Sequence, residues 1–504
     1  MLGGLSRRLF LGGAVSAIAG VAVGEAPLRS VRPKPRPGTV GMPAAPTVDE
    51  LVAQARLGGR LGFVVLDARS GAVLEQHNPD IALPPASITK LVTALYATEM
   101  LGAGFRFRTE FRATGPVVDG VIQGDLVLRG SGDPVLDTDA LSSMVARLKA
   151  AGVRGVTGAF RIYAGALPYF RSIDPRQPAH VGYNPAISGT NLNYNRVHFQ
   201  WQRADAGWKL SMDARSETLR PAVSVARMAV VKRELPVYTY AAEGGVDEWT
   251  VAAAALGNGG SRWLPVRRPD LYAGEVVQVI ARSHGIILPA PTVAGADAPG
   301  EVLVSHDSPD LASITRAMLK YSTNLTAEVL GLTATAARGG DVSSLEASAK
   351  AMTKWMQASL GTGGGARFVD HSGLSDRSRI SPRDMAALLL AQGPGSALHG
   401  QMKEIVPLSQ KGERVSDAPF RIHAKTGSLN FVSTLAGYVT GAGDTPMLFA
   451  ILSGDTERRA AIAPDDMERP AGARSWARRA RWLQHQFIRR WWALYARPEP
   501  VSKG

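Results

Sequence analysis

The first segment of the chain with a regular pattern of apolar and polar residues begins with short apolar runs separated by turn residues. Residues 61–67 form a nearly continuous apolar run, and a Ser-Gly turn separates them from a second run over residues 72–75. Two prolines then interrupt the chain, and a long stretch of apolar residues and good helix formers follows. This pattern predicts a β-hairpin that leads into a helix, with Ser87 in the first turn of that helix.

A helical pattern dominates the region after residue 307. Three helices are predicted there, over residues 309–321, 325–337 and 343–361. Ser308 is the predicted N-cap of the first helix, and Ser343 with Glu346 has the spacing of a capping box for the third. The break between the first two helices falls at residues 322–324, Ser-Thr-Asn, which can project polar side chains into a cleft.

Three apolar runs joined by short turns follow, over residues 420–427, 432–439 and 447–452. They predict an antiparallel edge of a sheet, and this edge carries Lys425. The segment between Lys90 and Ser322 is far longer than a loop requires. Its predicted elements are strands at residues 124–130, 159–163, 223–226 and 237–240 and helices at residues 140–151 and 271–284. We interpret most of this segment as an inserted, β-rich structure.

The composition narrows the chemistry. The chain has 504 residues and no cysteine, which excludes thiol catalysis, disulfides and thiolate zinc sites. The histidines show no metal-ligand spacing, and no serine lies in a Gly-x-Ser-x-Gly turn. We therefore expect no metal and no cofactor, and neither a metal hydrolase nor an α/β-hydrolase.

The net charge of +14 is concentrated at the two ends of the chain. Residues 1–48 and 469–504 hold most of the excess of lysine and arginine, so the part between them is nearly neutral. This distribution argues against a nucleic-acid partner.

The N-terminus has the features of an export signal. Residues 6–11, Ser-Arg-Arg-Leu-Phe-Leu, resemble a twin-arginine signal, and an apolar run rich in glycine and alanine continues to Val23. Small residues before Glu25 would allow cleavage, and an uncleaved membrane anchor is the alternative. Both predict that the folded part is periplasmic, behind a proline-rich spacer at residues 26–47.

Residues 466–504 combine aromatic and basic side chains at near-helical spacing. The apolar positions are Trp476, Leu483, Phe487, Trp491 and Leu494, and the basic positions are Arg478, Arg479, Arg481, Arg489 and Arg490. We favour a terminal helix that packs its aromatic residues on a sheet, at least in its first half. Peripheral contact with an anionic membrane is the alternative, and it stays open for the end at Trp491.

Ser87 and Lys90 form the first candidate catalytic pair. Residues three apart lie on the same face of a helix, so the amine of Lys90 is expected beside the hydroxyl of Ser87. Burial of that amine would lower its pKa toward a value useful for a base, and a serine hydroxyl needs such a base to become a nucleophile. Taken alone, a pair of this kind is common by chance.

Two later polar clusters give the pair its significance. They are Ser322-Thr323-Asn324 and Lys425-Thr426-Gly427. Each alone is more often a helix cap or a surface turn, and residues 428–430 repeat the Ser-x-Asn pattern once more. The three clusters in this order are the pattern of β-lactamases and penicillin-binding proteins.

With these motifs the chain resembles the class C low-molecular-mass penicillin-binding proteins, which are serine-type D-alanyl-D-alanine carboxypeptidases and endopeptidases. The resemblance covers about residues 48–460 and includes the segments 130–134, 191–195 and 370–375. Thr323 and His371 depart from the family pattern, where an acidic residue and glycine are frequent.

The resemblance implies a mixed α/β fold, in which a serine transpeptidase/β-lactamase-like domain has an antiparallel sheet flanked by helices and a large β-rich insertion. It divides the catalytic domain into residues 48–105 and 305–465, around inserted residues 106–304. The signal at residues 1–25, the spacer and the C-terminal helix lie outside these parts.

The resemblance also implies catalytic roles. Ser87 would attack the carbonyl between two terminal D-alanines, with neutral Lys90 as general base. Ser322 would relay a proton to the leaving amine. Asn324 would hold the substrate backbone and the ammonium group of Lys90.

Residues of the third cluster would bind the substrate. Lys425 and Thr426 would hold its terminal carboxylate, and Gly427 would let the strand approach without a Cβ atom. The backbone N–H groups of Ser87 and Ser428 would form the oxyanion hole. The expected ligands are peptidoglycan peptides ending in D-Ala-D-Ala and β-lactam antibiotics that acylate the same serine.

Two alternatives belong to other functional classes. A β-lactamase would use the same motifs, but the large insertion argues against it. A non-catalytic peptidoglycan-binding scaffold is disfavoured by the intact Ser87, Lys90 and Lys425. Carboxypeptidase and endopeptidase activity both fit the motifs.

Overall fold

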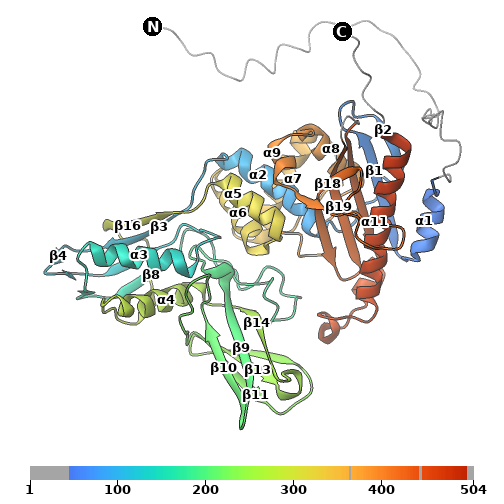
Figure 1. The fold of residues 1–504 in the computed structure, drawn as a ribbon. Coiled ribbons are helices and arrows are strands. Elements are labelled where there is room, and N and C mark those ends of the chain that lie inside the picture. The colour runs from blue at the N-terminus through green and yellow to red at the C-terminus, as the bar shows by residue number, and fades with distance from the viewer. Residues whose placement is uncertain (1–44, 362–364, 442–444, 497–504) are drawn as a thin grey trace, which may run out of the picture. The chain divides into compact units, whose positions relative to one another are not determined.

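A six-stranded antiparallel sheet forms the centre of the computed structural model, which describes residues 45–361, 365–441 and 445–496 (Figure 1). The strands follow the order β17-β18-β19-β20-β1-β2. They are β1 (Arg60–Asp67), β2 (Val73–His77), β17 (Lys403–Ile405), β18 (Phe420–Leu429), β19 (Val432–Gly441) and β20 (Met447–Gly454). Because β1 pairs with β20 along its whole length, the first and last parts of the chain share this sheet.

Both faces of the sheet are buried, which explains the continuous apolar runs of its central strands. In β1, Phe63 and Val65 belong to one apolar core, and Val64 and Leu66 belong to the other. The strands β19 and β20 are buried along nearly their full length as well. Burial on both faces removes the alternation that a half-exposed strand would show.

The strand that carries Lys425 is not the edge of the sheet, which corrects the sequence-based prediction. The short β17 lies outside it and pairs with residues 422–424. This pairing stops before Lys425, so the remaining outer side of β18 has no strand partner among the described residues. A free backbone edge of this kind can pair with an extended peptide.

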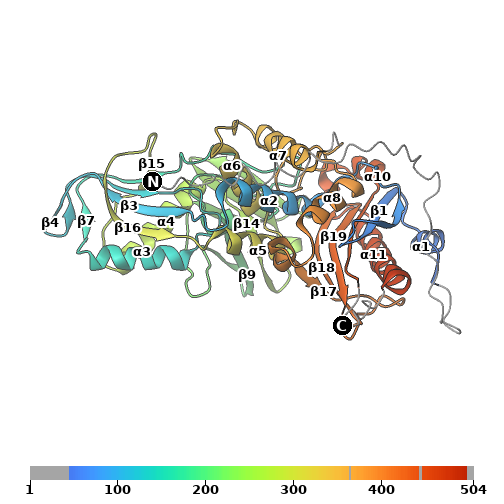
Figure 2. The same cartoon turned by 90° about the horizontal axis from the view of Figure 1, so that it is seen from above.

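Helices cover both faces of the sheet. One face carries α2 (Thr89–Leu101), α5 (Leu311–Tyr321), α6 (Asn324–Ala336), α7 (Leu345–Leu360), α8 (Pro382–Gln392) and α9 (Ala397–Gln401). The other face carries α1 (Val48–Ala55) and α11 (Ala473–Tyr495), and the short α10 (Thr456–Ala460) follows β20. The α2 helix contacts α5, α6 and α7, although these lie far away in the sequence (Figures 1 and 2). The predicted antiparallel sheet flanked by helices is therefore confirmed.

The C-terminal helix packs its aromatic residues on the sheet, as predicted for its first half. Trp476, Phe487 and Trp491 are completely buried. The ring of Phe63 in β1 lies against the rings of Phe487 and Trp491. The second half of the helix is therefore part of the core too. Among the described residues, no helix has the length and apolar character needed to cross a bilayer.

The segment between α2 and α5 forms sheets of its own. A five-stranded sheet of order β15-β8-β6-β3-β16 shares one apolar core with two helices and smaller sheets. The elements are β3 (Arg108–Ala113), β4 (Val117–Val118), β5 (Val121–Ile122), β6 (Leu126–Arg129), α3 (Thr138–Ala150), β7 (Gly155–Val156), β8 (Phe160–Tyr163), β9 (Arg196–Ala204), β10 (Gly207–Asp213), β11 (Ala226–Val231), β12 (Tyr238–Glu243), β13 (Val246–Ala252), β14 (Gly259–Pro265), α4 (Pro269–Ser283), β15 (Pro291–Val293) and β16 (Glu301–Asp307). The first and last strands, β3 and β16, pair with each other, so the segment leaves and rejoins the helical layer at one place.

The predicted start of α5 was wrong. Asp310 caps this helix, because its carboxylate accepts the N–H group of Ser313. The hydroxyl of Ser308 instead accepts the N–H group of Phe107 at 3.0 Å. This bond ties together the two ends of the inserted segment.

Two further local predictions were wrong. Ser344 caps α7, and Glu346 forms an ion pair with Arg377 instead of completing a capping box. The strand predicted at residues 223–226 begins only at Ala226. The predicted signal, nearly all of the proline-rich spacer and the end of the C-terminal tail lie outside the described residues.

Candidate active site

Ser87 lies at the start of the predicted helix, but on a tighter turn than predicted. Residues Ala86–Ile88 form a 3₁₀ turn that runs into α2 at Thr89. Ala86 has a φ angle of 47°, in the left-handed region that residues with a side chain seldom occupy. This turn directs the partly exposed side chain of Ser87 into a cleft.

Lys90 is the buried centre of the site. Its side chain is completely buried, and its Nζ lies 3.1 Å from Oγ of Ser87, 2.8 Å from Oδ1 of Asn324 and 2.6 Å from the carbonyl oxygen of Ser372. These three acceptors match the three N–H donors of an ammonium group. When Lys90 loses a proton, the hydroxyl of Ser87 is the one partner of the three that can become a donor.

Burial lowers the pKa of Lys90 to about 8. The negative charges of Asp370 and Glu328 oppose this shift, because they stabilise the charged amine. An amine with a pKa of about 8 is partly neutral under physiological conditions, and the neutral form can accept the proton of Ser87. The lowering of this pKa was predicted from the sequence and is confirmed.

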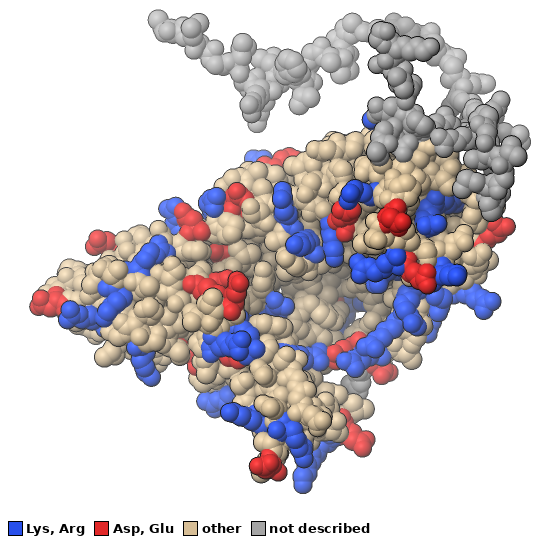
Figure 3. Space-filling view, in the orientation of Figure 1, with Lys and Arg blue, Asp and Glu red and all other residues tan. Residues whose placement is uncertain are grey.

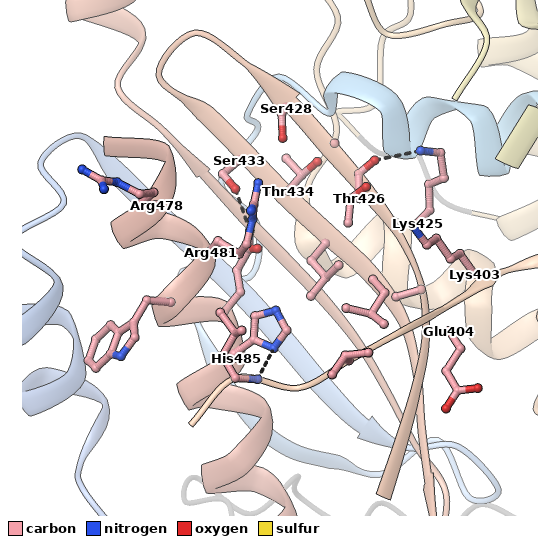
Figure 4. A pocket seen from close by; sticks show the side chains of 18 of the residues that line it. Lys403, Glu404, Lys425, Thr426, Ser428, Ser433, Thr434, Arg478, Arg481 and His485 are labelled. Atoms are coloured by element: carbon pink, nitrogen blue, oxygen red, sulfur yellow. Dashed lines mark hydrogen bonds between the residues drawn. The ribbon is translucent and has the colours of Figure 1, made fainter. Parts of the chain in front are cut away.

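A second amine and a second hydroxyl face the same cleft. The Nζ of Lys425 lies 2.9 Å from Oγ of Ser322. It also donates a hydrogen bond to the carbonyl oxygen of Thr426 at 2.9 Å (Figure 4). Ser322 ends α5 with a φ angle of 59°, and this left-handed residue turns the chain toward α6. Burial, together with the charges of Lys90 and Lys403, lowers the pKa of Lys425 well below its usual range. A carboxylate bound nearby would counteract this effect.

Asn324 is the first residue of α6 and joins Lys90 to the inserted segment. Its Oδ1 accepts a hydrogen bond from Lys90, and its Nδ2 donates to the carbonyl oxygen of Tyr183 at 2.9 Å. An amide nitrogen has two N–H donors, so one is left for a ligand. The adjacent Thr323 donates its hydroxyl to Thr326 at 2.8 Å, which holds the first turn of α6.

Gly427 is the point where β18 lies against the turn that carries Ser87. A Cβ atom at this position would lie 2.8 Å from the carbonyl oxygen of Pro85 and 2.9 Å from the backbone nitrogen of Ser87. Any other residue would push the strand away from Ser87. The flanking Thr426 and Ser428 are exposed.

The sequence did not reveal what holds Lys90 in place. Ser372 presents its carbonyl oxygen to Lys90, and the N–H groups of His371 and Ser372 donate to the carboxylate of Glu328 on α6. Glu328 is completely buried, and burial raises its pKa. The available signal was the single charged residue of the α6 sequence, one turn after Asn324.

Asp370 fixes the other half of the same turn. Its two carboxylate oxygens accept the N–H groups of Gly373 and Ser375 at 2.9 Å and 2.6 Å. Gly373 has a φ angle of 74°, and a Cβ atom there would overlap the carbonyl oxygen of Ala86. This turn, part of the segment 370–375 that carries the family resemblance, thus contacts both Lys90 and the turn before Ser87.

His371, which departs from the family pattern, fits into space left by Gly331. A Cβ atom on Gly331 would overlap the imidazole ring. The ring is buried, and its Nε2 lies 2.8 Å from Oγ of Ser348. Burial lowers the pKa of His371 to about 3, so the ring is neutral and packs as part of the core.

The structure brings all eight predicted site residues together. A cleft of about 750 Å³ is lined by Ser87, Ser322, Asn324 and Ser428, with Lys90 and Lys425 bonded to these residues from behind. The inserted segment contributes its wall at Gln177 and Tyr183, and the C-terminal segment contributes Arg459 and Glu468. Among the described residues, no cluster of acidic and histidine side chains has the geometry of a metal site.

A serine on a tight turn before a buried helix, a lysine amine beside it and a second lysine on the adjacent strand form the arrangement of a serine acyl-transfer enzyme of the penicillin-binding type. The comparison with protein families identifies one family within this class. The chain belongs to the D-Ala-D-Ala carboxypeptidase 3 (S13) family, whose model matches residues 44–470. The enzyme is therefore a serine-type D-Ala-D-Ala carboxypeptidase, and the class inferred from its motifs is confirmed.

Two relatives align in sequence with this chain over most of their own length. The chain is 27% identical over 458 residues to the D-alanyl-D-alanine carboxypeptidase of Actinomadura sp. (strain R39), covering 83% of this chain and 82% of the relative. It is 23% identical over 460 residues to the D-alanyl-D-alanine carboxypeptidase DacB of Haemophilus influenzae, covering 83% and 91%. The crystal structure of penicillin binding protein 4 (dacB) from Haemophilus influenzae has the same fold, with a TM-score of 0.67, 20% identity and coverage of 85% of this chain and 99% of that one.

Proposed function

We propose that Ser87 is the residue acylated by a peptide ending in D-Ala-D-Ala and that Lys90 is its general base. The observation that supports this proposal most directly is the distance of 3.1 Å between Nζ of Lys90 and Oγ of Ser87. The Oγ atom of Ser87 attacks the carbonyl carbon of the penultimate D-alanine while its proton passes to Lys90. The N–H groups of Ser87 and Ser428 stabilise the resulting oxyanion, each by roughly 3 kcal/mol.

Ser322 and Lys425 act on the leaving group. As the C–N bond breaks, the leaving amine takes a proton that Ser322 relays from Lys90 or Lys425. The contact of 2.9 Å between Lys425 and Ser322 supports this relay. Water then attacks the acyl-enzyme, Lys90 removes its proton, and the free Ser87 hydroxyl is restored.

The terminal carboxylate of the substrate binds at Lys425 and Thr426. A carboxylate there returns positive charge to Lys425, whose pKa is lowered in the empty site by burial and by two neighbouring lysines. The peptide lies along the outer side of β18, where no described strand pairs beyond Ala424. Asn324 holds its backbone with the N–H donor that Tyr183 leaves free.

β-Lactam antibiotics are expected to acylate Ser87, because their strained amide places a carbonyl and a carboxylate where the peptide places its own. A solved structure of penicillin binding protein 4 from Haemophilus influenzae contains a novel β-lactam. We expect slow release of the acyl group here, in contrast to a β-lactamase.

The proposed location is the periplasm, after export through the twin-arginine-type signal at the N-terminus. Trp476, Phe487 and Trp491 are buried in the core and cannot enter a membrane surface. Within the described part of α11, the exposed arginines are therefore the feature that supports peripheral attachment.

Release of D-alanine from a synthetic pentapeptide tests the function. Wild-type protein should release one D-alanine per peptide, and Ser87→Ala should lower kcat by at least about 1,000-fold at unchanged folding. Mass spectrometry of the products identifies the bond that is cleaved. A Ser87→Ala variant with wild-type activity would exclude the proposed nucleophile, and an inactive wild type would favour a binding scaffold.

A further inference from the structure

A large cavity adjoins the catalytic cleft on the side of Lys425 and Thr426, where the terminal carboxylate of the substrate is proposed to bind. It has a volume of about 1010 Å³ and lies between α11 and β18, with β17 and the loop after it as a further wall (Figure 4). It shares Ser322, Ser428 and Arg478 with the cleft that contains Ser87, so the two form one continuous groove. A free D-alanine would fill only a small part of this space.

The lining of this cavity is strongly basic. Besides Lys425, it contains Lys320, Lys403, Arg414, Arg478, Arg479 and Arg481. The single acidic residue in the lining is Glu404, which is already paired with Arg421 at 2.7 Å. Figure 3 shows basic side chains gathered along this part of the molecule beside a hollow.

The cations of this cavity form no ion pair with another described residue. This holds for all six arginine and lysine residues that line the cavity besides Lys425. The Nε atom of Arg479 is buried and lacks a hydrogen-bond partner. By contrast, two arginines close to the cleft are paired, Arg459 with Asp376 and Arg262 with Glu468. Like charges gathered without a counter-charge favour an anionic ligand.

The charge of Lys403 also reaches the catalytic groups. It contributes to the lowered pKa of Lys425, which lies at the boundary between the cavity and the cleft. A ligand that places one carboxylate at Lys425 and more carboxylates farther along would relieve repulsion at both places. A leaving peptide with acidic side chains or a free carboxyl end has this chemistry, and the leaving D-alanine has only one carboxylate.

We propose that this basic cavity binds carboxylates of a leaving peptide, so that the enzyme cleaves cross-linked peptides with acidic leaving strands in preference to releasing single D-alanines. Arg481 and Lys403, on opposite sides of the cavity, are the residues that determine this specificity (Figure 4). The inference rests on the proposed function, because it takes the direction of the groove from the position of Ser87.

The first test uses wild-type protein and matched substrates. Two peptides share the same acyl part and differ in the leaving peptide, which carries either two free carboxylates beyond the scissile bond or the corresponding amides. We expect kcat/KM to be about tenfold higher for the carboxylate form at low salt, with the difference shrinking as ionic strength rises. Equal kcat/KM values for the two peptides at low salt would overturn the proposal.

The second test uses variants. Arg481→Ala should lower kcat/KM about threefold for the carboxylate-bearing leaving peptide and less than about twofold for release of D-alanine, and adding Lys403→Ala should bring the loss for the carboxylate-bearing peptide to about tenfold. Arg489→Ala, on the same helix but outside the cavity lining, is the matched control and should change neither value. Equal losses for both substrates, or no loss for either, would contradict the assignment.

Labelled penicillin separates this inference from the proposed function. The Arg481→Ala variant should acquire label at the wild-type rate, because it leaves Lys403 and the catalytic groups unchanged. Absence of label on wild-type protein would reject the Ser87 mechanism itself. The proposed specificity would be overturned if an unrelated polyanion inhibited both peptide reactions strongly while the enzyme did not distinguish the carboxylate from the amide leaving peptide. That result would assign the cavity to another anionic polymer.

Discussion

The ammonium nitrogen of Lys90 lies 2.6 Å from the carbonyl oxygen of Ser372, a residue 282 positions later in the chain. The N–H group of the same Ser372 donates to the carboxylate of Glu328 at 2.9 Å. The backbone of one residue, Ser372, thus connects a buried base to a buried acid. This relationship places Glu328 behind Lys90 as a positioning residue that does not touch the substrate.

Replacing Glu328 by glutamine should move the pH dependence of acylation. In the wild type, acylation by a β-lactam should rise with pH as Lys90 loses its proton, around a pKa of about 8. The charge of Glu328 stabilises protonated Lys90, so removing this charge lowers the pKa of Lys90. The acidic limb of the pH–rate profile for acylation then shifts to lower pH. Stopped-flow acylation rates across the pH range measure the shift.

Glu346→Gln is the control for this change, because Glu346 is an exposed acidic residue on the neighbouring α7 helix. The acidic limb of the pH–rate profile of Glu346→Gln should coincide with that of the wild type. If the acidic limb of the Glu328→Gln profile stays in place or moves to higher pH, the carboxylate of Glu328 does not act on Lys90.

Replacing Gly373 by alanine should disrupt the site. Its φ angle of 74° disfavours a side chain, and the added Cβ atom would overlap the carbonyl oxygen of Ala86 and lie 2.6 Å from Oγ1 of Thr89. The turn would have to move away from Lys90 and Ser87. We expect acylation to slow by about 100-fold, as for a displacement of reacting groups by about 1 Å.

Gly361→Ala separates backbone strain from the clash. Gly361 has a φ angle of 61°, but no atom lies within 4 Å of the position of its Cβ. This variant should lose about 1 kcal/mol of stability and keep the acylation rate. Equal acylation rates for Gly373→Ala and Gly361→Ala would contradict the role assigned to the turn.

Gly331 should resist replacement by alanine even though it lies inside a helix. Alanine usually stabilises a helix relative to glycine by about 1 kcal/mol. Here its methyl group would overlap the buried ring of His371, and overpacking of this kind costs about 1–3 kcal/mol. We therefore expect a lower midpoint of urea unfolding for Gly331→Ala. Gly400→Ala in α9, where no atom lies within 4 Å of the Cβ position, should leave the midpoint equal or slightly higher.

The C-terminal helix should contribute strongly to stability. Trp491 is completely buried, and its indole N–H donates to Glu75 at 2.8 Å. Trp491→Ala should reduce the free energy of unfolding by about 3–5 kcal/mol, as measured by chemical denaturation. The adjacent Trp492 is only half-buried, so Trp492→Ala should cost clearly less. Equal losses would show that the two side chains do not differ in burial in solution.

Much of this architecture could be predicted because its sequence signals are local. The paired strands β1 and β2, the helices α5 to α7 and the strands β18 to β20 all follow from apolar runs between turns. The first residues of α5 and α7 were misassigned, because neighbouring residues compete for the cap and only packing decides between them. Ser308 was taken as a cap, yet it bonds Phe107, which lies 201 positions earlier in the chain.

The predicted catalytic residues come from short motifs, and the groups that support them do not. The positions of Ser87 and Lys90 follow from helical spacing. The contacts of Lys90 with Ser372 and of Ser372 with Glu328 join distant segments, and no spacing within the sequence encodes them. The packing of His371 against Gly331 also joins distant segments. The need for glycine at this helical position is evident only once the ring of His371 is seen beside it.

Acylation of Ser87 is the event on which the mechanism depends. Intact-mass analysis and peptide mapping after incubation with benzylpenicillin measure it directly. The account predicts one covalent adduct per wild-type chain, located on the peptide that contains Ser87, and no adduct on Ser87→Ala. An adduct on another residue, or unmodified wild-type protein beside intact antibiotic, would contradict it.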